Sequence, residues 1–167
     1  MALDRDAEFT RFVGERTAWL RKVAFLLCQD WHRADDLVQT TITQAYVHWR
    51  RVRSADDQDA YVRRMLVNAF LAERRAGWLS RVSLTAQPPE RPGHDPDATT
   101  GIALRAALAE IPPRQRAALV LRYFCDLTVE DTADALGCSI GTVKSQTARG
   151  LVALRKAWPA PAAPGME

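Results

Sequence analysis

Between Ile140 and Trp158 the chain carries four basic side chains and no acidic one. The basic residues are Lys144, Arg149, Arg155 and Lys156. A helix of this composition suits a DNA major groove, because its cations attract phosphate and no carboxylate is present to repel it. An ordinary helical hairpin with a solvated basic face would show the same charge pattern. The charges alone therefore leave both interpretations open.

The residues that precede this basic segment predict a helix followed by a tight turn. Val129, Thr132, Ala133 and Leu136 recur at the spacing of one helix face. Thr128 can cap this helix, and Asp131 completes a box-like start. Gly137-Cys138-Ser139 then breaks the pattern, with Gly137 suited to the positive φ that ends a helix. Two short helices joined by a three-residue turn form a helix-turn-helix.

The second of these helices is expected to have a clear inner and outer face. The residues predicted to face inward are Ile140, Val143, Thr147, Leu151, Leu154 and Trp158. The residues left facing outward are Thr142, Lys144, Ser145 and Arg149. The outer face is thus polar in front and basic at its sides, as base edges and phosphates require.

Length and composition favour a chain with one full domain or two small ones. It has 167 residues, 47% of them hydrophobic, and a formal net charge of +3, so buried cores are expected. Cys28, Cys125 and Cys138 are too widely spaced for a disulfide framework or a metal knuckle. No apolar run is long enough for a membrane span, and the polar N-terminus does not resemble a signal peptide. We therefore expect a cytoplasmic protein with reduced thiols and no membrane insertion.

The N-terminal half predicts three amphipathic helices. They are expected from Glu8 to Leu27, from Asp35 to Val52 and from Asp59 to Ala76, with a short connection at Trp31–Ala34 and a polar loop at Arg53–Gln58. The third helix exposes a mixture of aromatic, amide and arginine side chains, namely Tyr61, Arg63, Arg64, Asn68, Arg74 and Arg75. Such a mixture can stack and clamp unpaired bases, although a solvated arginine face is an equally simple interpretation.

A proline-rich segment marks the boundary between the two halves. Residues 84–100 hold four prolines and no periodic apolar pattern, which is typical of an extended tether. We predict an all-α protein with two small helical domains, at residues 1–80 and 101–158, a flexible linker at 81–100 and a disordered tail at 159–167. A single fused globule, or a front half without an exposed cationic and aromatic ridge, would contradict this organisation.

Two segments of the chain resemble known domains of one family. IPPRQRAALVLRYFCDLTVEDTADALGCSIGTVKSQTARGLVALRK is similar to the promoter-reading C-terminal domain of bacterial RNA polymerase sigma factors, in particular the extracytoplasmic-function (ECF, group IV) class. ADDLVQTTITQAYVHW resembles the segment with which these factors grip core polymerase. DAYVRRMLVNAFLAERR resembles the segment that melts and reads the −10 element, and VKSQTARGL resembles a variant seen in actinobacterial members of the SigE type.

The resemblance implies three sets of functional residues. Thr142, Lys144, Ser145 and Arg149 would lie nearest the −35 bases and phosphates, and Arg122 and Thr128 could hold adjacent phosphates. At −10, the resemblance implies base contacts by Tyr61, Arg64 and Asn68, and phosphate contacts by Arg63, Arg74 and Arg75. The polymerase-binding patch would comprise Asp35, Asp36, Leu37, Gln39 and Thr40, although two aspartates at this position could instead serve only the helix N-terminus.

The sequence also departs from the family pattern. Val67 stands where many members carry an arginine, and Ala72-Glu73 stands near a usual aspartate. In the second helix of the motif, Gln146, Thr147 and Leu151 replace common family residues. These differences leave the predicted fold intact and bear on the choice of promoter.

The expected partners are core RNA polymerase, duplex −35 DNA and single-stranded −10 DNA. An anti-sigma factor is a further partner that the class commonly has, and the linker would permit it to wrap the chain. No catalytic motif or metal spacing surrounds His32, His48 or His94, so we expect no enzyme activity, cofactor or small-molecule substrate. Two alternatives remain: a free-standing helix-turn-helix regulator that binds operators, and an interaction protein that sequesters polymerase.

Overall fold

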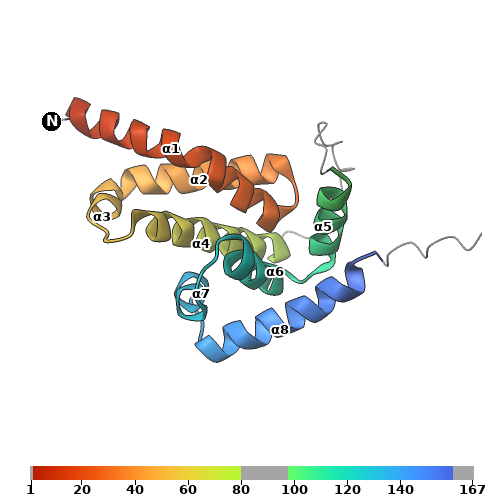
Figure 1. The fold of residues 1–167 in the computed structure, drawn as a ribbon. Coiled ribbons are helices and arrows are strands. Elements are labelled where there is room, and N and C mark those ends of the chain that lie inside the picture. Colours follow the sequence, from red (N-terminus) through yellow and green to blue (C-terminus); the bar gives the residue numbers. More distant parts are fainter. Residues whose placement is uncertain (1, 80–97, 160–167) are drawn as a thin grey trace, which may run out of the picture.

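The computed structural model describes residues 2–79 and 98–159, with the backbone alone for Ala2, Arg74, residues 76–79 and residues 98–100. Every regular element in these two ranges is a helix, which confirms the predicted all-α class. The N-terminal half contains α1 (Ala2–Cys28), α2 (Trp31–Val47), α3 (Trp49–Arg53) and α4 (Gln58–Leu79). The C-terminal half contains α5 (Ala98–Glu110), α6 (Pro113–Leu119), η1 (Val120–Phe124), α7 (Val129–Leu136) and α8 (Ile140–Ala157). Figure 1 shows α4 between the α1–α2 pair and the helices of the C-terminal half.

The second helix begins earlier than the sequence predicts. Trp31–Ala34 was expected to be a connection, but these residues form the first turn of α2. Asp30 is the reason, because its carboxylate accepts a 3.1 Å hydrogen bond from the backbone N–H of Arg33 and so caps the helix. Trp31 then stacks on Phe25, with ring centroids 4.0 Å apart.

The same helix also ends earlier than predicted. His48, with φ −100° and ψ 21°, interrupts the expected continuous helix and separates α2 from the short α3. The break lets Trp49 reach the core, where it is 2% exposed and meets the edges of Phe9 and Phe12 at centroid distances of 5.2 and 5.0 Å. Burial of an aromatic side chain of this size is a large contribution to the core, so tertiary packing overrides helix continuity here.

The helix-turn-helix has the predicted start, turn and second helix. The Thr128 hydroxyl accepts a hydrogen bond from the backbone N–H of Asp131 at 3.0 Å, and Gly137 ends α7 with φ 64°. Ser139 caps α8 by accepting a 3.1 Å hydrogen bond from the backbone N–H of Thr142. Thr128 thus fixes where α7 begins, and Gly137 and Ser139 fix the turn between the two helices.

The inner face of α8 is shorter than predicted. Val143 is buried at 1% exposure, but Ile140 and Trp158, at the two ends of the helix, are 43% and 41% exposed. Close approach of α8 to α6 occurs instead at Gly150, where an added Cβ would lie 3.0 Å from Cγ of Leu119. Sequence periodicity did not identify this contact, because glycine carries no apolar side chain.

Helix α5 begins inside the segment predicted as a linker. Residues 98–100 already belong to α5, so the predicted tether ends at least three residues earlier than expected. The rest of the predicted linker, residues 80–97, and most of the predicted tail, residues 160–167, lie outside the described residues.

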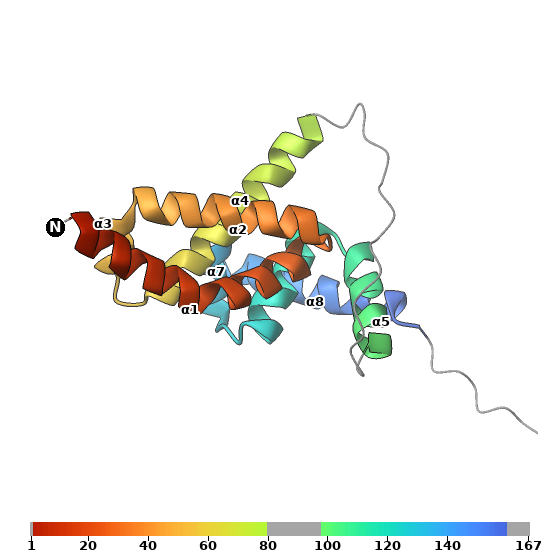
Figure 2. The same ribbon diagram turned by 90° about the horizontal axis from the view of Figure 1, so that it is seen from above.

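The two halves pack against each other through one shared hydrophobic core. Helix α4 packs against α7, while α1 packs against α6 and η1. A single cluster of buried residues therefore runs from Phe9 and Leu27 in α1 through Phe70 in α4 to Leu121 and Leu136 in the C-terminal half. Figure 2, from a second direction, shows α7 and part of α8 behind the N-terminal helices and α5 beside them.

Candidate nucleic-acid interface

The exposed side of α8 carries most of the predicted −35 residues. Lys144, Ser145 and Arg149 are exposed. Thr142 is half-buried, its hydroxyl lies 2.9 Å from that of Ser139, and its carbonyl accepts a 3.0 Å hydrogen bond from Ser145. The polar groups of Thr142 therefore take part in hydrogen bonds at the start of α8, whereas Lys144 and Arg149 present their charged side chains to solvent.

The exposed surface of α8 continues beyond the residues identified from the sequence. Ser145, Arg149, Val152 and Lys156 follow one another at helical spacing, and Arg155 is exposed beside them. Val152 is 50% exposed, which places an apolar contact within an otherwise polar stripe. Arg155 and Lys156 lie outside the predicted set of contact residues, although the absence of acidic residues through the whole helix indicates them as well.

Arg122 and Thr128 lie near the start of α7, but both side chains already have partners in the protein. Arg122 donates a hydrogen bond to the carbonyl of Leu127, which ties it to the turn before α7. The Thr128 hydroxyl is the N-cap of α7. Both side chains thus shape the helix start, where free backbone N–H groups can hold an anion.

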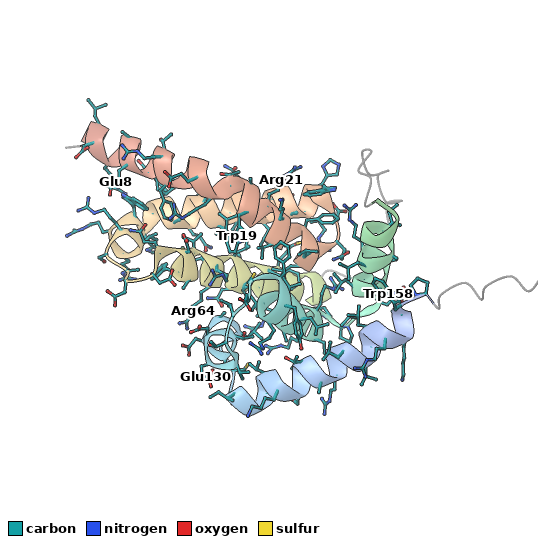
Figure 3. The ribbon with its side chains drawn as sticks, in the orientation of Figure 1. Glu8, Trp19, Arg21, Arg64, Glu130 and Trp158 are labelled. Atoms are coloured by element: carbon teal, nitrogen blue, oxygen red, sulfur yellow. The ribbon has the colours of Figure 1, made fainter. Side chains whose placement is uncertain are left out.

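The residues predicted for the −10 element occupy one side of α4, with one exception. Arg64, Asn68 and Arg75 are exposed and Tyr61 is half-buried. At about 100° per residue, these four lie within one sector of about 60°, and we call them the α4 ridge. Figure 3 labels Arg64 at the side of α4 nearer to α7. The side chain of Arg74 lies outside the described residues.

Arg63 is the exception, because it lies against the protein. Its guanidinium carbon is 5.2 Å from the ring centroid of Trp19 in α1, a cation–π distance. Its Nε is buried and has no hydrogen-bond partner. The sequence placed Arg63 with the exposed phosphate-binding residues, but in this structure it is half-buried.

The predicted polymerase-binding patch on α2 divides into exposed and engaged residues. Asp36, Gln39 and Thr40 are exposed, whereas Leu37 is 3% exposed and belongs to the core. The sequence placed Leu37 in this patch, but in this structure its side chain lies in the core and not at the surface. Asp35 is held by Arg21 through hydrogen bonds of 2.6 and 3.2 Å.

The exposed side of α2 extends further along the helix than the sequence indicated. Thr43, Gln44 and Val47 follow Thr40 on the exposed side, and Val47 is 66% exposed. An isolated exposed valine is ordinary on a protein surface, but here it continues the exposed stripe that Asp36 begins. We call residues Asp36, Gln39, Thr40, Thr43 and Val47 the α2 stripe.

The described residues contain neither a cluster of metal-binding side chains nor a helix that could span a membrane. Across residues 2–79 and 98–159, no group of three or more His, Cys, Asp or Glu side chains is arranged to hold a metal ion. In the same ranges no helix combines the length and apolarity that crossing a bilayer requires. Burial raises the pKa of Cys28 to about 12 and that of Cys125 to about 11, so neither thiol is a poised nucleophile.

Two family models match the two halves of the chain. The model described as sigma-70 region 2 matches residues 12–79, and the model described as sigma-70, region 4 matches residues 101–154. The first covers α4 and its ridge, as well as α2 and its stripe. The second covers the helix-turn-helix with nearly all of α8.

Known proteins are similar over almost the whole chain. The RNA polymerase sigma-E factor of Streptomyces coelicolor is 39% identical over 153 residues, which cover 89% of this chain and 85% of that protein. The ECF RNA polymerase sigma factor SigE of Mycolicibacterium smegmatis is 32% identical over 144 residues, covering 80% of this chain and 55% of that protein. Among solved structures, the sigma factor RpoE from Bartonella quintana, in a complex with the anti-sigma factor NepR, has a TM-score of 0.68 at 24% identity and covers 90% of this chain and 96% of that chain.

The class of protein follows from these matches: a two-domain sigma factor with region 2 and region 4. The chain belongs to the sigma-70 family of RNA polymerase sigma factors, within its ECF class and of the SigE type.

Proposed function

We propose that this sigma factor divides promoter recognition among three separate surfaces. The outer face of α8 reads the −35 duplex, the α4 ridge holds the unpaired −10 strand, and the α2 stripe binds core polymerase. The observation that carries the proposal is the exposed face of α8, which has no acidic residue. Helix α8 is the second helix of a helix-turn-helix, in which Thr128 and Ser139 cap the starts of the two helices and Gly137 ends the first.

The charges of α8 support duplex binding. Lys144, Arg149, Arg155 and Lys156 are all exposed, and each phosphate that they neutralise releases counterions, which favours association. Ser145 and Arg149 lie where an inserted helix presents side chains to base edges. Val152 adds an apolar contact of the kind that a thymine methyl accepts.

The composition of the α4 ridge supports strand capture. Tyr61 can stack on a base, Asn68 can hydrogen-bond to one, and Arg64 and Arg75 can neutralise phosphates. Opening a base pair costs a few kcal/mol, which stacking and hydrogen bonding on such a ridge offset. The α2 stripe supports polymerase binding because it is exposed, uncharged over most of its length and bounded by the carboxylate of Asp36.

We assign residues 1–80 to the polymerase-binding and −10 domain and residues 101–158 to the −35 domain. The polymerase performs the chemistry of transcription, so the chain itself is not an enzyme, and it works in the cytoplasm, where the polymerase is. Because similar proteins are known in complexes with anti-sigma factors, an anti-sigma factor is a further partner that we assign to this chain.

Run-off transcription tests the proposal directly. Core polymerase supplied with the full chain is expected to produce promoter-dependent transcripts from a library of genomic fragments, and core polymerase alone is not. Failure to obtain any transcript across the library would refute the assignment. A free-standing regulator makes a different prediction, since it would shift duplex DNA in a gel without polymerase.

A further inference from the structure

Several arginines of the described residues already have a partner inside the protein. The arginines that form ion pairs with carboxylates are Arg16, Arg21, Arg33 and Arg53. Arg63 and Arg105 instead lie over aromatic rings. An arginine engaged in this way has already used part of its donors or of its charge within the protein.

Other exposed arginines make no hydrogen bond, ion pair or ring contact with any residue that the structure describes. They occur on both surfaces that we assign to DNA, as Arg64 does on the α4 ridge and Arg149 on α8. Arg50 and Arg51 are also of this kind and follow one another in α3, and we call them the α3 pair. Neither the α4 ridge nor the α2 stripe includes them. An exposed guanidinium without an internal partner keeps all of its N–H donors and its charge for an anion from outside the protein.

Two buried neighbours turn the α3 pair outward. Trp49 is 2% exposed and Val52 is 0% exposed, and residues three apart lie on the same side of a helix. Edge contacts with Phe9 and Phe12 hold the ring of Trp49. The two residues between these anchors therefore point to solvent, and their charges are presented from a fixed piece of backbone.

Helix α3 is fixed beside the N-terminal end of α4, where the α4 ridge begins with Tyr61. The two helices pack against each other, and the side-chain amide of Gln58 donates a 3.1 Å hydrogen bond to the carbonyl oxygen of Arg53. Asp57 caps the start of α4, because its carboxylate accepts a 2.9 Å hydrogen bond from the backbone N–H of Ala60. Figure 1 shows α3 at this end of α4. A DNA strand that lies along the ridge and continues past Tyr61 would therefore pass close to α3.

The carboxylates near α3 leave the charge of the α3 pair largely uncompensated. Glu8 and Asp59 each pair with another arginine. Asp57 accepts from the backbone at the start of α4, so Asp56 is the one loop aspartate without a partner among the described residues. Two unengaged guanidiniums beside one such carboxylate make this end of the N-terminal half locally basic.

We propose that the α3 pair binds the phosphate backbone of the promoter strand that the α4 ridge holds, at the end of the ridge where Tyr61 lies. The proposal rests on the function proposed above and adds a contact to it. Phosphate is favoured over bases because Tyr46, the nearest exposed aromatic residue along the chain, is already engaged: its ring lies under Arg5 and its hydroxyl donates to Asp6 at 3.0 Å. Contacts to phosphate position a strand without reading its sequence.

The salt dependence of promoter binding tests the contact. Arg50→Gln combined with Arg51→Gln, the glutamine double variant, is assembled with core polymerase and titrated with a promoter fragment whose −10 strand is left unpaired. It is expected to bind about tenfold more weakly than the unaltered chain, and by the same factor for different −10 sequences. The slope of log affinity against log salt concentration should fall in magnitude by about 1.4, because each lost contact to a single strand removes about 0.7. An unchanged slope would overturn the proposal.

Two further variants separate a local contact from the general charge of the protein. Arg11→Gln combined with Arg114→Gln is the matched control, because it removes the same charge from exposed arginines on α1 and α6 that have no partner among the described residues. Its slope should match that of the unaltered chain. Arg50→Lys combined with Arg51→Lys should restore the slope, since the slope counts charges, and circular dichroism compares the helicity of all the variants. A control slope as low as that of the glutamine double variant, or no recovery with lysine, would overturn the proposal.

Neutral methylphosphonate linkages locate the contact on the DNA. They are placed one at a time along the −10 strand of the same promoter fragment. At the phosphates that the α3 pair binds, the replacement should weaken binding by the unaltered chain and cause no further loss in the glutamine double variant, as a double-mutant cycle requires of two groups in contact. Equal losses for the two chains at every position would contradict the proposal.

Binding to core polymerase without DNA distinguishes the other possible partner. The glutamine double variant is expected to bind core polymerase as tightly as the unaltered chain does. Weaker binding would assign the α3 pair to an acidic surface of the polymerase and refute the DNA contact. If the unaltered chain and core polymerase together do not retain the promoter fragment, the proposed function has failed and the α3 contact fails with it. Retention of the fragment with the same salt slope in both chains refutes the α3 contact alone.

Discussion

The guanidinium of Arg21 in α1 holds the carboxylate of Asp35 in α2 through two hydrogen bonds, of 2.6 and 3.2 Å. This hydrogen bonding lowers the pKa of Asp35 below its ordinary value. The pair is about half exposed, with side chains 46% and 51% exposed, so solvent screens it and its contribution to stability is small. Whatever it contributes is present above the unfolded-state pKa and is lost as the pH falls through the lowered value.

This pairing leads to a prediction about the two neighbouring aspartates. Asp36→Asn is expected to weaken polymerase binding by about 0.5–1 kcal/mol, because an exposed carboxylate at the edge of an interface can meet a basic partner. Asp35→Asn should weaken it less, since Arg21 already neutralises that carboxylate. Competition binding with labelled core polymerase measures both. Equal losses would show that Asp35 leaves Arg21 on binding.

Arg149→Ala is expected to weaken −35 recognition by about 1–3 kcal/mol, the value of one good base contact. Arg114→Ala, which removes an exposed arginine from α6, is the control and should leave recognition unchanged. Transcription from promoters with altered −35 bases gives the measurement. An unchanged promoter preference in Arg149→Ala would remove this residue from the reading set.

Asn68→Ala together with Tyr61→Ala is expected to leave polymerase binding intact and to block strand opening, because the ridge then lacks its stacking and amide groups. Permanganate footprinting of unpaired thymines measures opening. Arg11→Ala, on the exposed side of α1, should footprint like the unaltered chain. Full permanganate reactivity in the double variant would place strand capture elsewhere.

Cys28 predicts a fall in stability at alkaline pH. Burial, the largest cause, raises its pKa to about 12 in the folded chain, so the folded state keeps a proton that the unfolded state loses above about pH 9. The stabilisation is complete below the unfolded-state pKa and is lost as the pH rises toward 12, at up to about 1.4 kcal/mol per pH unit. Urea unfolding between pH 8 and 10.5 should therefore show a steeper decline than in Cys28→Ala. Parallel declines in the two proteins would contradict the assignment to Cys28.

Gly150→Ala is expected to destabilise the chain by about 1–3 kcal/mol through overpacking, because the added Cβ meets Leu119 at 3.0 Å and the backbone oxygen of Gln115 at 3.3 Å. The matched control is Gly141→Ala in the same helix, where the nearest atom is 3.9 Å away. That control should be neutral or gain up to about 1 kcal/mol from helix propensity. Thermal unfolding distinguishes the two, and equal melting temperatures would exclude the close contact.

Local signals in the sequence predicted the helix-turn-helix correctly. Thr128, Gly137 and the polar face of α8 each depend on interactions within a few residues, so their types and spacing are sufficient to indicate the structure. The early start of α2 was not predicted. The side chain of Asp30 caps the helix, but Asp35 and Asp36 are also typical of a helix N-terminus and indicated a later start.

Contacts between distant segments could not be predicted in the same way. The buried cluster that runs from α1 and α4 into η1 and α7 depends on the packing of one half on the other, which no local pattern encodes. Arg63 illustrates the consequence for the candidate site: its type and spacing resemble those of its exposed neighbours, and only the approach of Trp19 and the C-terminal half distinguishes it. Leu37 is buried although it was predicted within the patch, because membership of a matching motif does not reveal which face of α2 a residue occupies.

The absence of a side chain at residue 150 has a consequence for the evolution of promoter choice. Gly150 allows α8 to lie directly on Leu119, so the position of the proposed reading helix relative to α6 depends on a residue that is buried on its inner side. A bulkier residue there would lift the helix as a unit and shift every base contact together. Relatives could in this way diverge in the DNA they prefer while keeping an identical outer face on the helix.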